Sequence, residues 1–120
     1  MNHVAYFGDG EKTFALTHPM IAELEQKTGV GAGLLYQRCM SAQFYMADLI
    51  ETIRLGLIGG GTSPADAQRL IDTYAIGRPV MEIVPLALDV LEAAWSGKSA
   101  TEAEQLSADI AEAYADAPDV

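Results

Sequence analysis

The sequence predicts a mainly α-helical protein, a small bundle of five to six helices with an N-terminal β-hairpin. Three observations support this prediction. Apolar residues recur at helical spacing along most of the chain, glycine and proline separate the periodic segments, and short β-prone runs occur near the start. Of the 120 residues, 50% are hydrophobic and 20% are charged, which is an ordinary globular balance. We therefore expect a hairpin and helical bundle over residues 1–98 and an acidic helix or tail over residues 99–120.

The hairpin is expected from two β-prone runs, Val4–Phe7 and Thr13–Leu16, which are separated by Gly8-Asp9-Gly10. Asp-Gly at such a position is typical of a type I′ turn, whose two central residues need positive φ. An isolated two-stranded hairpin is marginal in water and leaves edges that pair with other strands. Either the hairpin packs on the bundle, or a partner completes it.

Two helices are expected in the first third of the chain. Thr17 offers an N-cap, and a proline lies in the first turn of a helix over Pro19–Thr28, which Gly29 ends. After a flexible link at residues 30–33, a short second helix is expected over Leu34–Met40.

Apolar periodicity and capping residues mark the third and fourth helices. From Phe44 onward the apolar residues follow one helical face, and the glycine run Gly59–Gly61 ends this helix. We interpret the run as a C-cap and flexible joint. An anion-binding loop is the less favoured alternative, because no lysine follows and Asp66 places an acid in the next first turn. Ser63 then caps a fourth helix that runs to about Ala75.

The fifth helix follows Pro79 and is apolar around most of its girth, so we expect it to lie in the middle of the bundle. Pro85 lies on its narrow polar stripe, which predicts a kink or a late helix start. Ser99, with an acid three residues later, favours a sixth helix. Residues 101–120 contain acids and no basic residue, so much of this segment should stay solvated.

Charge and cysteine content argue against several classes of partner. The 17 acidic and 7 basic residues leave a net charge of −10, which repels nucleic-acid phosphates and anionic lipids, so we expect neither nucleic-acid nor membrane partners. The most apolar stretch, residues 80–95, is shorter than the roughly 20 apolar residues that cross a bilayer. The single cysteine, Cys39, forms no internal disulfide, and the start has no secretory pattern, so a cytoplasmic location is expected.

The sequence contains no convincing catalytic or metal-binding pattern, and we expect neither an enzyme nor a cofactor. His3 and His18 are isolated from other ligand types, so no metal site is expected. Cys39 is interpreted as a packing residue rather than a nucleophile. Asp48 and Glu51, three apart on a helix, are interpreted as part of a solvated surface rather than an acid–base pair.

Aromatic residues predict instead a surface that binds other proteins. Phe44 and Tyr45 are adjacent at a helix start, where one helical face can hardly bury both, although filling of core gaps is an equal alternative. The free edges of the hairpin offer a second surface, through which the chain could form a homo-oligomer. The candidate partner-binding residues are Tyr36, Phe44, Tyr45, Phe7 and Phe14.

Several short motifs follow one another in a distinctive order after the hairpin. They are Leu24-Glu25 with Gly29, Ala47-Asp48-Leu49, Gly56-Leu57, Gly59-Gly60-Gly61 and Ala93-Ala94-Trp95-Ser96-Gly97. This order resembles the tail assembly chaperones of gene transfer agents and related tailed phages, over roughly Val4 to Gly97.

The resemblance implies a non-enzymatic protein of a bacterial host cell that binds the tape measure protein and keeps it soluble while tail tube subunits polymerise around it. Tail tube subunits would then be a further partner. Some members of this family are labelled tail tube proteins, which implies an alternative role as a structural subunit of the tail tube or tail connector. The acidic segment after residue 100 lies outside the resemblance.

Overall fold

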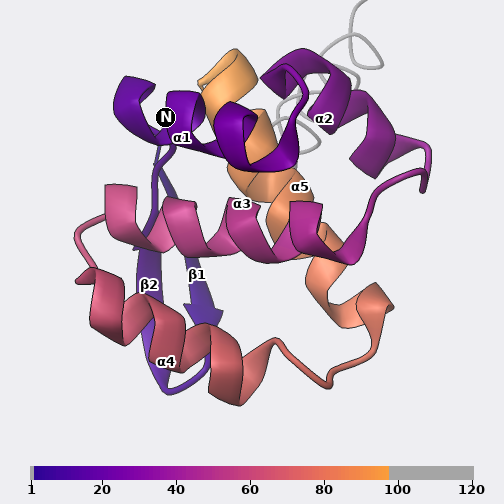
Figure 1. The fold of residues 1–120 in the computed structure, drawn as a ribbon. Coiled ribbons are helices and arrows are strands. Elements are labelled where there is room, and N and C mark those ends of the chain that lie inside the picture. The colour runs from indigo at the N-terminus through magenta and orange to yellow at the C-terminus, as the bar shows by residue number, and fades with distance from the viewer. Residues whose placement is uncertain (1, 98–120) are drawn as a thin grey trace, which may run out of the picture.

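A β-hairpin and five helices make up residues 2–97, the part of the chain that the computed structural model describes (Figure 1). The strands are β1 (His3–Phe7) and β2 (Gly10–Phe14). The helices are α1 (His18–Thr28), α2 (Ala32–Met40), α3 (Met46–Gly59), α4 (Pro64–Tyr74) and α5 (Val80–Ser96). The predicted fold class is confirmed, whereas the helix expected after Ser99 lies outside the described residues. No helix of the described part is long and apolar enough to cross a membrane.

The hairpin is closed by a different turn from the one expected. Phe7 pairs with Gly10, so the two loop residues are Gly8 and Asp9. Gly8 has a φ of 71°, whereas Asp9 is not among the residues with positive φ. Positive φ at the first central residue alone is the pattern of a type II′ turn, in which glycine is preferred at that position. The type I′ prediction was therefore wrong, although the hairpin itself is confirmed.

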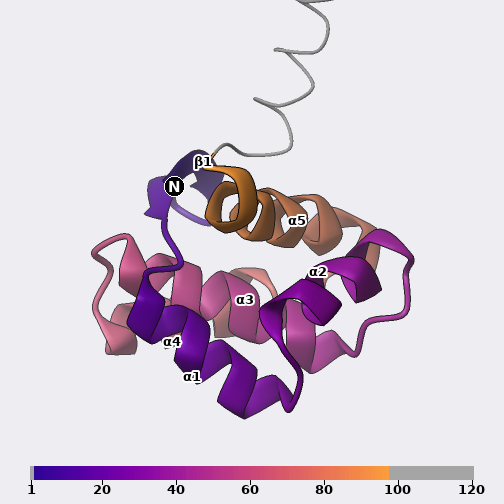
Figure 2. The same cartoon turned by 90° about the horizontal axis from the view of Figure 1, so that it is seen from above.

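Helix α3 lies at the centre of the fold, packed against α1, α4, α5 and β2 (Figure 2). Seven of its residues are buried over a wide arc: Asp48, Leu49, Thr52, Ile53, Leu55, Gly56 and Leu57. The prediction that the fifth helix is central was wrong, because α5 packs on one side of α3 and leaves Met81 and Trp95 exposed. High apolar content alone does not distinguish a central helix from one with an exposed apolar side.

Helix α5 continues through Pro85 without a break, so the late-start alternative was wrong. Proline removes the hydrogen bond to the carbonyl four residues earlier, here that of Met81. Both Pro85 and Met81 are exposed, so water can solvate that carbonyl. The helix therefore loses one bond at a solvated position without burying an unsatisfied group.

The glycine run at the end of α3 is a packing contact, not the flexible joint that we expected. A Cβ atom on Gly59 would lie 1.8 Å from the carbonyl oxygen of Ala15, and one on Gly60 would lie 1.9 Å from that of Thr13. The backbone of α3 thus crosses β2 and the residue after it at a distance that only glycine permits. The amide of Ala15 also donates to the carbonyl of Gly56 at 2.9 Å. This contact fastens the hairpin to the bundle and covers one edge of β2.

Candidate partner-binding surfaces

The side chains that first suggested chemistry have structural roles. Cys39 is buried, and burial together with the nearby charge of Asp48 raises the pKa of its thiol to about 11. A thiol with such a pKa stays protonated and is a poor nucleophile at neutral pH. Within residues 2–97, no group of three or more His, Cys, Asp or Glu side chains is placed to hold a metal ion.

Asp48 is buried at the start of α3 rather than on a solvated surface, so that interpretation was wrong for this residue. Its carboxylate accepts a hydrogen bond of 2.8 Å from the backbone amide of Tyr45, and the guanidinium of Arg38 lies 3.9 Å away. An acid at the third helical position stabilises the exposed amides of a helix start. The hydrogen bond to Asp48 therefore fixes the backbone of Tyr45 as the N-cap of α3.

The five predicted partner-binding residues differ widely in exposure. Phe14 is completely buried in the core, where it cannot contact a partner directly. Phe44 is partly buried against the same core. Phe7 is also partly buried, with its ring in edge-to-face contact with those of Phe14 and Tyr74, at centroid distances of 6.2 and 6.4 Å. Of the five, Tyr45 is the one whose side chain is mostly exposed.

Tyr36 belongs to a small polar and aromatic cluster between α2 and α5. Its hydroxyl donates to the carboxylate of Glu92, and this bond, together with burial, raises the pKa of Tyr36 to about 12. The ring stacks on that of Trp95 at a centroid distance of 5.8 Å. Tyr36 therefore joins two helices, and Trp95, with 67% of its surface exposed, covers it from outside.

An apolar surface lies where the start of α3 meets the connection between α4 and α5. We call it the Tyr45 surface, defined by Tyr45, Met46 and Ile76. Tyr45 and Ile76 are 71% and 57% exposed. A groove of about 270 Å³ beside Met46 and Ile76 is lined mainly by apolar groups of Met46, Ala47, Ile50 and Ile76. Tyr45 is adjacent to Met46 in the chain but outside this lining, and the guanidinium of Arg38 lies over its ring at 5.8 Å from the centroid. An exposed apolar groove of this kind is typical of a protein-binding surface.

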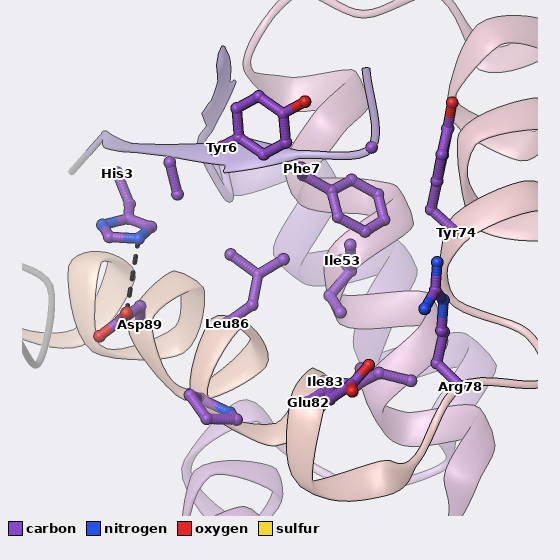
Figure 3. A pocket seen from close by; sticks show the side chains of 13 residues that line it. His3, Tyr6, Phe7, Ile53, Tyr74, Arg78, Glu82, Ile83, Leu86 and Asp89 are labelled. Carbon is purple, nitrogen blue, oxygen red and sulfur yellow. Dashed lines mark ion pairs between the residues drawn. The ribbon is translucent and has the colours of Figure 1, made fainter. Parts of the chain in front are cut away.

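A second, larger groove of about 490 Å³ lies between β1 and the first half of α5 (Figure 3). We call it the β1 groove. Phe7, Ile53 and Leu86 line it with apolar side chains from β1, α3 and α5. His3 lies 3.5 Å from the carboxylate of Asp89 at one end, and Arg78 and Glu82 lie toward the other. Tyr6 points away from α5, on the outer face of the strand.

Sequence reasoning missed the contribution of Met46 and Ile76. The apolar spacing from Phe44 onward predicts Met46 on the apolar face of the third helix, but Met46 lies in the first turn of α3, beyond the residues that pack on the core. Ile76 is the second residue after the end of α4 at Tyr74, and it precedes Gly77. An isolated apolar residue in a short connection was the one signal that could have drawn attention to it.

Comparison with known proteins places most of the chain in one family. Residues 1–97 match the family model described as "Phage tail tube protein, GTA-gp10". The matched residues include the hairpin, all five described helices and both grooves. No curated protein and no solved structure matches the chain.

Proposed function

The chain belongs to the family of phage tail tube proteins described as GTA-gp10, and from this we propose that it is a structural subunit of a phage-like tail that assembles by binding other tail proteins. The observation that carries the proposal is the extent of the match, from residue 1 to residue 97. The proposed role is non-enzymatic, which agrees with the structural roles of Cys39 and Asp48 described above.

The Tyr45 surface is the part of the molecule that we assign to contacts with neighbouring tail subunits. Its three side chains lie outside the core cluster of buried residues, so folding alone does not account for them. Burying such apolar groups against a partner would stabilise a complex by about 25 cal/mol for each Å² removed from water, before the costs of association.

Copy number in purified particles tests the structural role. We expect the chain in particles at many copies, quantified by mass spectrometry against the major head protein of the same preparation. A tail subunit should remain after nuclease treatment and density-gradient purification. Its complete absence from intact, tailed particles would refute the structural role.

A pair of matched double variants tests the surface. Met46→Asp with Ile76→Asp should leave the fold intact, because an acid in the first turn favours the helix and Ile76 lies outside any helix. This variant should reduce incorporation into particles at least tenfold. The control is Gln43→Asp with Thr73→Asp, which adds the same two charges three residues away on exposed positions. Equal incorporation of the two variants, both folded by circular dichroism, would remove the Tyr45 surface from the proposal.

The second candidate is the tail assembly chaperone of the tape measure protein, which is the role that the sequence resemblance implies. The family description favours the structural role over it. The observation that keeps it as a candidate is the apolar groove beside Ile76, since such grooves bind amphipathic helices. A chaperone would keep a co-expressed tape measure protein soluble and would be missing from purified particles, so the same particle measurement separates the two roles.

A further inference from the structure

The two outer edges of the hairpin differ in how they are covered. Helix α3 covers the edge of β2, through the close approach of Gly59 and Gly60 and the bond between Ala15 and Gly56. Helix α5 packs against β1, with His3 3.5 Å from the carboxylate of Asp89, but this contact is made by side chains and not by the backbone of the β1 edge. The hairpin is the whole of its sheet, and no backbone hydrogen bond to the outer edge of β1 is found within residues 2–97.

The strand register shows which backbone groups lie on this open edge. A two-residue turn closes on a hydrogen-bonded pair, here Phe7 with Gly10, and such pairs alternate along an antiparallel ladder. Ala5 and His3 therefore bond to β2, whereas the N–H and C=O groups of Val4 and Tyr6 point outward. Both residues are well exposed, at 52% and 74%.

Open edges of natural sheets are usually protected by lysine, proline or a bulge, because they pair with other strands. Strand β1 has none of these features, since its residues read His-Val-Ala-Tyr-Phe and its pairing with β2 is regular. The β1 groove lies directly beside this edge, with its apolar lining on the side to which Phe7 points (Figure 3). A bare edge beside an apolar groove is the arrangement that accepts an added strand.

We propose that the β1 groove binds an extended polypeptide segment of another tail protein, which adds to the open edge of β1 as a third strand. The backbone of the segment bonds to Val4 and Tyr6, and its alternate side chains enter the groove above Ile53 and Leu86. The open edge of β1 and the groove beside it indicate an extended peptide as the ligand. The assignment of this peptide to another tail protein rests on the proposed function.

The charges of the groove define the segment further. Arg78 is exposed and takes part in none of the ion pairs found in the described part of the chain. It lies at the Phe7 end, so the segment carries an acidic residue there. Asp89 lines the His3 end and disfavours an acid there, whereas Glu82 lies toward the same end as Arg78. The ligand is thus a β-prone segment with alternating apolar residues and one acid at the end near Arg78.

Fluorescence anisotropy with labelled peptides tests the inference on the full chain. The first probe is a six-residue peptide of alternating valine and threonine with one terminal glutamate, and the second carries lysine in place of glutamate. Overlapping twelve-residue peptides from the other proteins of the particle form a third set. We expect the wild-type chain to prefer the glutamate probe and to bind at least one peptide of the third set.

Two substitutions identify the site. Val4→Pro removes an N–H from the open edge without removing a bond to β2, and should weaken binding at least tenfold. Arg78→Glu should weaken binding of the glutamate probe at least tenfold and strengthen binding of the lysine probe. The matched control is Lys27→Glu, the same charge change at an exposed position of α1 that lies outside the groove and takes part in none of the ion pairs found in the described residues, and it should change binding less than twofold.

The outcomes separate this inference from the proposed function. Failure of every probe, or binding that neither Val4→Pro nor Arg78→Glu weakens, would overturn the inference. Binding of the glutamate probe with no hit in the third set would support the groove and count against the tail partner. A peptide of residues 98–120 that competes at the groove, or a dimer that Val4→Pro dissociates, would replace the proposed partner by this chain's own segment or by a second copy.

Discussion

Replacing Gly59 by alanine tests the packing of the hairpin on α3 most directly. The new Cβ atom would lie 1.8 Å from the carbonyl oxygen of Ala15. Because the backbone fixes the position of a Cβ atom and the carbonyl oxygen belongs to the backbone, neither atom can rotate away, and α3 and the end of β2 must move apart by more than an ångström to reach ordinary contact. The movement also strains the hydrogen bond of 2.9 Å between Ala15 and Gly56.

The expected loss can be estimated from its parts. Overpacking of this kind costs about 1–3 kcal/mol, and weakening the hydrogen bond adds up to about 1 kcal/mol. The better helix propensity of alanine offsets up to about 1 kcal/mol of this loss. The net destabilisation is therefore about 2 kcal/mol. With an m value of about 1 kcal/mol per M urea, the unfolding midpoint should fall by about 2 M.

The assay is urea denaturation followed by far-UV circular dichroism, with Gly33→Ala as the control. Gly33 lies inside α2, and a Cβ there would meet the ring of Trp95 at 3.5 Å, an ordinary contact. The same substitution should therefore stabilise the chain by about 0.5–1 kcal/mol through helix propensity. If Gly59→Ala unfolds at the wild-type urea concentration or above it, the close crossing of α3 and β2 is refuted.

Two further predictions concern Tyr36 and Ala42. The folded chain retains the proton of Tyr36, with a pKa of about 12, at pH values where the unfolded chain, with an ordinary value of 10.0, releases it. The free energy of unfolding should therefore fall as the pH rises from about 10 to 12. Urea denaturation at a series of pH values should show a smaller fall for Tyr36→Phe than for the wild type. Identical pH dependence of the two proteins would contradict the prediction. Ala42 has a φ of 59°, which strains any residue with a side chain, so Ala42→Gly should raise the unfolding free energy by about 0.5–1 kcal/mol. Ala22→Gly, at an exposed position in the middle of α1, should lower the free energy by a similar amount, and equal effects at both sites would argue against the strain at Ala42.

The candidate surfaces could be predicted only in part. The expectation that a helix start can hardly bury both Phe44 and Tyr45 is confirmed, since Tyr45 is 71% exposed, but the sequence did not indicate which of the two rings would be exposed. Phe14 was also a predicted partner-binding residue, yet it is completely buried. Its burial depends on the approach of α3 through Gly56, where a Cβ atom would lie 3.5 Å from the ring of Phe14. A contact between segments some forty residues apart leaves no local signal in the sequence.

The sequence by itself determined the helices, the hairpin and most of their ends, because these depend on neighbouring residues. Ser63 illustrates this, since its hydroxyl accepts a bond of 3.2 Å from the amide of Asp66, as its position before a proline predicted. Only the tertiary structure decided that α3 rather than α5 is central, that Gly59 permits a crossing rather than a hinge, and that the edge of β1 is open. These outcomes depend on which segments, far apart in the sequence, bury their apolar surfaces against one another. The hydrophobic effect is non-directional, so the apolar pattern of one segment does not specify its partner.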